Sequence, residues 1–157
     1  MCYSEEIKNA IIEASRVVGR QIDESDFYIE YQPEGHTPKA LPQGKMAVYT
    51  FVCNGCFLKI GQANAKSKAR YQSQHYLANS TRSTLAKSLL GDPEMSLIVN
   101  EGNVAQWIKD NCKRYDVIID EKYGKNALDF IEGMLHYMYN PKYEGRTRRR
   151  RDKNYFC

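Results

Sequence analysis

Two β-type runs separated by the dipeptide Asn54-Gly55 constrain the fold of this chain more than any other feature. The first run, 48–52, combines valine with aromatic and β-branched residues, and the second, 57–60, returns after the dipeptide. Asn-Gly between two such runs is the strongest short-range signal for a β-hairpin that a sequence offers. We therefore predict an antiparallel hairpin around this turn.

A helix is predicted directly behind the hairpin. After Gly61 the composition shifts to Ala, Lys, Gln and Arg, which are good helix formers, and Asn64 is a suitable cap. The predicted helix spans 64–77. The hairpin and this helix carry three polar side chains capable of chemistry: Tyr49, Lys59 and Arg70.

The register of the hairpin decides whether Tyr49 and Lys59 share a face of the sheet. A two-residue turn at Asn54-Gly55 would place them on opposite faces, because side chains alternate along a strand. A three-residue loop with Gly55 in the left-handed bulge position would instead place Tyr49 directly opposite Lys59. If the two residues act in one site, the bulged turn must form, and we predict that register.

Length and composition are typical of one soluble domain, residues 1–157. The chain is 42% hydrophobic and 27% charged, which is ordinary for a globular protein of this size. No apolar run approaches the roughly 18 residues of a membrane helix, and the N-terminus lacks a signal-peptide pattern. We expect a cytoplasmic protein with no membrane partner. Five cysteines, an odd number without framework spacing, predict reduced thiols.

The hydrophobic patterns along the rest of the chain predict an α+β fold. The expected elements are a helix from Ser4 to before Gly19, a short strand over 26–31, a loop over 33–45 with His36 on its surface, helices over 83–90 and 102–112 with an extended piece over 95–99 between them, a strand over 115–119 and a helix over 125–138.

A second group of notable residues lies toward the end of the chain. Glu132 stands among the apolar residues of the last predicted helix, and a buried carboxylate must be paired or bind a metal. His136, one turn later, could reach the same metal, but most such pairs are incidental. The helix is followed by Pro141-Lys142-Tyr143.

These two groups of residues together resemble the GIY-YIG nuclease superfamily. Ala47-Val48-Tyr49 stands where the family has Gly-Ile-Tyr, and Lys59-Ile60-Gly61 stands where it has Tyr-Ile-Gly. Glu132 and Pro141-Lys142-Tyr143 have the spacing of the family's metal-binding glutamate and its Pro-x-Tyr-Asn segment. The resemblance covers residues 47–145. It implies a GIY-YIG fold, a small three-stranded antiparallel sheet flanked by helices, extended here by an N-terminal helix and a helical insertion.

The resemblance also implies a metal-dependent endonuclease that hydrolyses phosphodiester bonds of DNA. Tyr49 would be the general base, and Glu132 would hold one divalent ion, Mg²⁺ or Mn²⁺, per active site. An unperturbed tyrosine has a pKa of about 10, and Lys59 is expected to lower it because a nearby ammonium favours the phenolate. Arg70 is suited to clamp phosphate oxygens. His75 stays open between a proton shuttle and a residue outside the site.

A basic tail, 146–157, follows the core, and Glu144 just before it stands where the family often has asparagine. A cationic cluster is a footprint of nucleic-acid binding, because neutralised phosphates release counterions. The same composition also fits a solvated end. The expected nucleic-acid contacts are Lys66, Lys68, Lys142, Arg146, Arg148, Arg149, Arg150 and Arg151.

Within the nucleases, a restriction-type or mobile-element (phage) enzyme is expected, and a structure-specific DNA repair nuclease is the alternative. The rival from another class is a nucleic-acid-binding module that keeps the fold and the tail without catalysis. DNA rather than RNA rests on the family alone. The sequence leaves open the recognition site, nicking versus double-strand cutting, and a monomer versus a homodimer.

Overall fold

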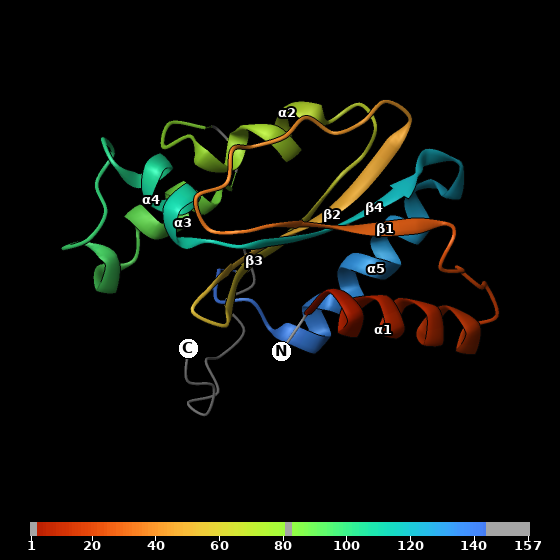
Figure 1. Ribbon diagram of the computed structural model, residues 1–157. Coiled ribbons are helices and arrows are strands. Elements are labelled where there is room, and N and C mark those ends of the chain that lie inside the picture. Colours follow the sequence, from red (N-terminus) through yellow and green to blue (C-terminus); the bar gives the residue numbers. More distant parts are fainter. Residues whose placement is uncertain (1–2, 81–82, 144–157) are drawn as a thin grey trace.

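A four-stranded antiparallel sheet is the centre of the computed structural model, which describes residues 3–80 and 83–143 (Figure 1). The strands follow the order β1-β4-β2-β3 across the sheet. The described part also contains five α-helices. The bounds are α1 (Tyr3–Val17), β1 (Phe27–Gln32), β2 (Lys45–Cys53), β3 (Cys56–Ala63), α2 (Lys68–Gln72), α3 (Leu85–Leu90), α4 (Val104–Asn111), β4 (Arg114–Asp120) and α5 (Gly124–Tyr139).

The predicted α+β class is confirmed, but the predicted three-stranded sheet is wrong. The segment expected as a short strand is β1, and it pairs with β4 along its whole length, from Phe27 opposite Ile119 to Gln32 opposite Arg114. Its two ends are buried, so β1 is a full member of the sheet rather than an appendage. With β1 included, the sheet has four strands, and β1 and β3 are its two edge strands.

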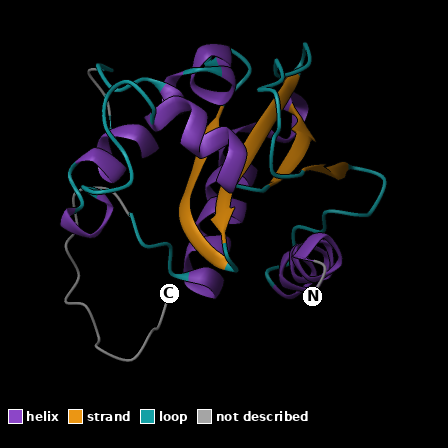
Figure 2. Ribbon diagram, turned by 60° about the vertical axis from the view of Figure 1, so that its left-hand side comes forward, coloured by secondary structure: helices purple, strands orange, loops and turns teal. Residues whose placement is uncertain are grey.

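Helices cover both faces of the sheet (Figures 1 and 2). On one face, α1 and α5 pack with residues of the sheet into a cluster that includes Ile7, Ile11, Val48, Leu128 and Ile131. These positions recur at helical spacing in α1 and α5, as the sequence predicts. The other face packs against α3 and α4 and the segment containing α2; its cluster includes Tyr49, Phe51, Tyr71, Leu85, Leu89, Val104 and Ile108.

The hairpin register differs from the prediction. Cys53 pairs with Cys56 around a two-residue turn, because Asn54 and Gly55 both take positive φ, 49° and 80°. A bulge then forms inside β3 at Leu58, so that Tyr49 lies opposite Gly61 and Lys59 lies opposite Phe51 rather than opposite Tyr49. Because Tyr49 and Phe51 are two residues apart on β2, Lys59 still shares the face of Tyr49.

The chain after α5 runs along the free edge of β3 at this bulge. The backbone N–H of Lys142 donates to Phe57 O at 2.9 Å, and that of Tyr143 donates to Leu58 O at 2.8 Å. Consecutive carbonyls of a regular strand point to opposite sides, so the bulge turns both toward this segment. The Pro141-Lys142-Tyr143 segment is thereby held beside the hairpin.

Three further expectations are corrected. The helix predicted over 64–77 is shorter, because 64–67 form a turn closed by the Asn64 side chain and Gln74–Tyr76 is a 3₁₀ turn after α2. The extended piece predicted over 95–99 is absent from that stretch; Pro93–Met95 is a 3₁₀ turn capped by Asp92. Among the thiols, Cys53 and Cys112 are free, whereas Cys56 is disulfide-bonded.

His36 is buried rather than on the surface. Its Nδ1 lies 3.0 Å from Cys112 O, and its Nε2 lies 2.7 Å from the hydroxyl of Tyr76. Because a carbonyl only accepts, Nδ1 carries the proton and Nε2 accepts from Tyr76. Burial lowers the pKa of His36, and the neighbouring Arg114 lowers it further. Burial likewise lowers the pKa of His75, well below the ordinary value of 6.5.

These two histidines predict a loss of stability in mild acid. Below 6.5 the unfolded state takes up protons that the folded state does not bind, so the free energy of unfolding falls as pH falls. Each histidine contributes a loss of up to about 1.4 kcal/mol between about pH 7.5 and about pH 5.5, the limit for a group that binds no proton in the folded state over this range. Urea unfolding at both pH values, with a His36→Gln variant in parallel, measures this. The variant should lose part of the dependence and keep the part due to His75; an unchanged dependence would contradict a neutral buried His36.

Within the described residues, no helix combines the length and the apolar character needed to cross a membrane.

Candidate active site at the edge of the sheet

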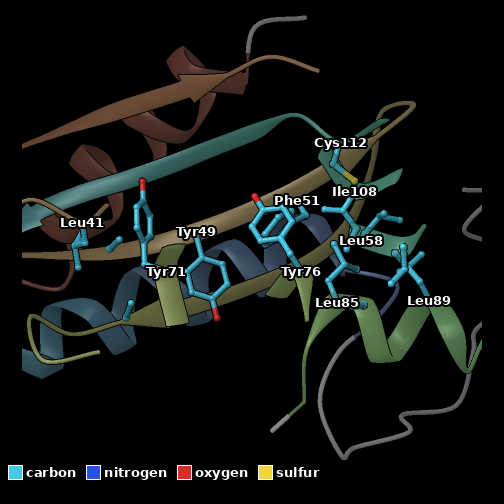
Figure 3. Packing of buried hydrophobic residues seen from close by; sticks show 14 of the residues in the cluster. Leu41, Tyr49, Phe51, Leu58, Tyr71, Tyr76, Leu85, Leu89, Ile108 and Cys112 are labelled. Carbon is cyan, nitrogen blue, oxygen red and sulfur yellow. The ribbon is translucent and has the colours of Figure 1, made fainter. Parts of the chain in front are cut away.

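The hydroxyl of Tyr49 is the centre of a hydrogen-bonded cluster on the face of α2. Arg70 Nε donates to it at 3.0 Å, and His75 Nε2 lies 2.6 Å from it. The rings of Tyr49 and His75 are 4.7 Å apart, and both residues are buried. Figure 3 shows Tyr49 projecting from β2 among Phe51, Tyr71 and Tyr76. Strand β2, helix α2 and the 3₁₀ turn after it therefore position this cluster.

The backbone determines which nitrogen of His75 carries the proton. The N–H of Leu85, at the start of α3, donates to His75 Nδ1 at 3.3 Å. Nδ1 is therefore the acceptor, and Nε2–H is the donor to Tyr49. With Arg70 as second donor, the Tyr49 oxygen accepts two hydrogen bonds, an arrangement that favours negative charge on the oxygen.

Arg70, rather than Lys59, is the cation in contact with Tyr49. Burial raises the pKa of Tyr49, and the charge and hydrogen bond of Arg70 act against that rise. Tyr49 has no exposed surface, so a water molecule reaches its hydroxyl only after a neighbour moves. The expectation that Lys59 lowers the pKa of Tyr49 is thus replaced by Arg70 in this role.

Lys59 lies on the same face of the sheet as Tyr49, but its side chain extends toward Ser83 and Tyr143. Its Nζ donates to Ser83 Oγ and to Tyr143 O, both at 3.3 Å. Burial lowers the pKa of Lys59, Arg70 lowers it further, and Glu132 opposes both. Lys59 therefore ties the segment after α5 to the hairpin and adds positive charge beneath the site.

The Tyr49 ring lies directly over Gly61 and leaves no space for a side chain at this position. A Cβ at this position would come within 2.7 Å of Tyr49 Cζ and 2.9 Å of Cε2, closer than such atoms approach. The backbone of Gly61, the glycine of the Lys-Ile-Gly motif, is thus in direct contact with the Tyr49 ring.

Gly61→Ala is expected to destabilise the protein by about 1–3 kcal/mol, because the rigid ring must shift and its hydrogen bonds with it. Urea unfolding measures the effect. Gly133→Ala is the matched control: it lies within α5, where a Cβ would meet no atom within 4 Å. That change should stabilise the protein by up to about 1 kcal/mol. Equal effects of the two alanines would contradict the close packing of Tyr49 on Gly61.

Glu132 approaches this cluster from the other face of the sheet. It lies on α5 with its side chain 24% exposed, and its Oε2 accepts from Gln62 Nε2 at 2.7 Å. His136 Nε2 lies 4.0 Å from its Oε1. Burial raises the pKa of Glu132, whereas His136, Gln62 and Arg70 act to lower it. Since Glu132 in turn influences Tyr49 and Lys59, the two groups of residues share one electrostatic neighbourhood at the edge strand β3.

The structure therefore brings Arg70 and His75 together at the hydroxyl of Tyr49, with Lys59 on the same face. Glu132 lies on the opposite face of the sheet and acts on this cluster through its charge. The described residues hold no group of three or more His, Cys, Asp or Glu side chains arranged to bind a metal.

A buried ion pair beneath the cluster was not found from the sequence. Arg114 and Asp116 are fully buried on β4, with Nη2 and Oδ2 2.9 Å apart. The Arg114 Cζ lies 4.8 Å from the ring centroids of Phe51 and Tyr71 and 6.0 Å from that of Tyr49. The signal was partly available: Asp116 lay in the predicted strand 115–119, but Arg114, two residues earlier and on the same face, lay just outside it.

The expected nucleic-acid contacts divide into three groups. Lys66 and Lys68 are exposed in the turn before Arg70 and at the start of α2. Lys142 is bound to carboxylates, 3.0 Å from Asp92 and 2.8 Å from Glu94. The others lie outside the described residues: Arg146, Arg148, Arg149, Arg150 and Arg151.

Comparison with models of protein families, with curated proteins and with solved structures gives no match to this chain.

Proposed function

We propose that this protein is a metal-dependent DNA endonuclease of the GIY-YIG type. The observation that carries the proposal is the meeting of Tyr49, Arg70 and His75 at one hydroxyl, opposite a half-buried Glu132. Tyr49 and Glu132 were selected from the sequence by their motif positions, Arg70 as a phosphate clamp, and His75 was left open; the residues come from three separate segments of the chain. Convergence of two donors on one tyrosine oxygen supports a catalytic role for it.

The donor set at Glu132 fits a magnesium site. Mg²⁺ commonly keeps several waters and binds through one or two carboxylates together with substrate phosphates, so a single carboxylate is sufficient. Glu132 is half-buried, and its charge lies in the field of Arg70. When bound, such an ion would neutralise charge on the scissile phosphate and at the leaving oxygen.

The two donors to the Tyr49 oxygen support its proposed role as a base. Arg70 and His75 both donate to this oxygen, and both bonds strengthen when it becomes a phenolate. His75 acts as a neutral donor held by Leu85, which favours an orienting role over that of a proton shuttle. Tyr49 would then take a proton from the attacking water.

DNA binding must also uncover Tyr49, which is fully buried here. Arg70 uses Nε for Tyr49, and its two Nη groups are the part of a guanidinium suited to a phosphate. A phosphate approaching over Lys66 and Lys68 would draw Arg70 toward it and open a path to the hydroxyl. Substrate binding would thereby make the Tyr49 hydroxyl accessible to water, while His75 stays as its donor.

The burial of Tyr49 and its raised pKa also favour one competing candidate, a nucleic-acid-binding module without catalysis. Such a module would use Lys66 and Lys68 for phosphate contacts and keep the Tyr49 cluster as core structure. A cleavage experiment separates the two functions.

The test is to incubate the purified protein with supercoiled plasmid, single-stranded DNA and a random-sequence duplex library, with Mg²⁺ or with EDTA. The library provides many recognition sequences, and sequencing of the ends locates cuts. We expect cleavage only with Mg²⁺, and the ratio of nicked to linear plasmid reports how many strands are cut. Binding that weakens with salt, without cleavage of any substrate, would establish the binding module instead. Absence of both would overturn both candidates.

A further inference from the structure

Gln62 connects Glu132 to the edge strand and to a second carboxylate. Its Nε2 donates to Glu132 Oε2 and to Asp129 Oδ1, each at 2.7 Å. Ionised carboxylates only accept hydrogen bonds, so the NH₂ group of the amide must face both of them. Both hydrogens of this NH₂ group are therefore committed, one to each acid.

The fold places this amide between the two parts of the site. Gly61 packs under Tyr49 on one face of β3, and Gln62, the next residue, points to the opposite face, where α5 lies. On α5, Asp129 and Glu132 are three residues apart and so share one side of the helix. Two adjacent residues of β3 therefore contact the two parts of the proposed site: Gly61 contacts Tyr49 on one face, and Gln62 contacts Glu132 on the other.

The hydrogen bond from Gln62 restricts the side chain of Glu132, beside the nearby His136. A glutamate side chain loses rotamer freedom when it is fixed, and a hydrogen bond already present before metal binding removes part of that loss. Asp129 is itself held by Lys125, whose Nζ lies 2.6 Å from Oδ2. Lys125, Asp129 and Gln62 therefore form a continuous chain of contacts that ends at Glu132.

We propose that Gln62 is a positioning residue for the metal-binding carboxylate: it holds Glu132 at the edge of the sheet, with Asp129 as its anchor. This proposal rests on the proposed function, because it assigns Glu132 the metal. Gln62 touches neither substrate nor metal in this role. Its contribution is to metal affinity.

The test is the affinity for Mn²⁺ alone, measured by isothermal titration calorimetry without DNA. Gln62→Leu should weaken Mn²⁺ binding by about 10- to 100-fold, as is typical when a group that orients a metal ligand is removed. Gln106→Leu is the matched control, because Gln106 also donates to a carboxylate, Asp110, at 2.8 Å but on the exposed side of α4. It should bind Mn²⁺ as the wild type does.

A cleavage titration supplies the second readout. For Gln62→Leu the half-saturating Mg²⁺ concentration should rise by a similar factor of about 10 to 100, while the rate at saturating Mg²⁺ recovers toward that of the wild type. Asp129→Ala, which removes only the anchor, should give a weaker shift in the same direction. A melting curve identifies any variant that does not fold. If Gln62→Leu does not fold, Asp129→Ala decides the test, because the Asp129 side chain is 44% exposed and its replacement should be tolerated by the fold.

The outcomes separate this proposal from the function on which it rests. If wild type binds Mn²⁺, Glu132→Gln does not, and folded Gln62→Leu binds as tightly as wild type, the positioning role is overturned and the metal site stands. If Glu132→Gln binds as wild type does, Glu132 is not the ligand, and both proposals fail. Weakening in Gln62→Leu but not in Gln106→Leu supports the positioning role.

Discussion

Glu132→Gln is expected to abolish DNA cleavage, by about 1000-fold or more, while DNA binding measured without metal changes by less than about threefold. The substitution keeps the shape of the side chain and its bond to Gln62 as an amide acceptor, but it removes the charge that would hold a divalent ion. A loss of this size corresponds to about 4 kcal/mol of transition-state stabilisation, which is within what a bound metal supplies. Plasmid cleavage and gel-shift binding measure the two quantities.

The control for this prediction is Glu13→Gln, an exposed glutamate on α1. It should cleave as the wild type does. Because burial raises the pKa of Glu132, its charged form is disfavoured in the fold, and Glu132→Gln should be at least as stable as the wild type. Cleavage by a folded Glu132→Gln variant at a rate near that of the wild type would remove Glu132 from the proposed site.

Tyr49→Phe is the second large effect, and it should alter both activity and stability. Loss of the hydroxyl removes the proposed base, so cleavage should fall by about 100-fold or more. It also leaves Arg70 Nε and His75 Nε2 without their acceptor inside the protein, which should cost about 1–3 kcal/mol of unfolding free energy. Cleavage rates and urea unfolding of the same preparation measure both.

Tyr28→Phe is the matched control, because Tyr28 is 47% exposed on β1. It should leave cleavage and stability close to those of the wild type. The wild-type rate should also rise with pH up to the pKa of Tyr49, about tenfold per pH unit, because burial raises that pKa and only the phenolate is the base. Retained cleavage in Tyr49→Phe would assign the base to another group and leave Tyr49 a core residue.

Local signals in the sequence were sufficient for most elements. Asn54-Gly55 predicted the hairpin turn, since both residues tolerate positive φ, and the spacing of apolar residues predicted α1 and α5. The motif positions also selected Tyr49 and Glu132, which the fold places on opposite faces of the sheet. Such signals act within a few residues, and a single chain displays them directly.

Contacts between segments that are distant in sequence could not be predicted from these local signals. The bulge at Leu58 depends on the segment after α5, and the role of Arg70 at Tyr49 depends on how α2 packs on the sheet. The burial of His36 likewise results from its contacts with Cys112 and Tyr76. None of these partners is near in sequence, so no local pattern encodes them.

By itself, the sequence determined the α+β class, the hairpin and the identity of the residues proposed for the site. Only the tertiary structure decided that the sheet has four strands, that Lys59 faces Ser83 and Tyr143 rather than Tyr49, and that Gln62 holds Glu132. The physical reason is the range of the forces involved. Backbone propensity and hydrophobic periodicity act along the chain, whereas hydrogen bonds, burial and the resulting pKa changes act between groups that only folding brings together.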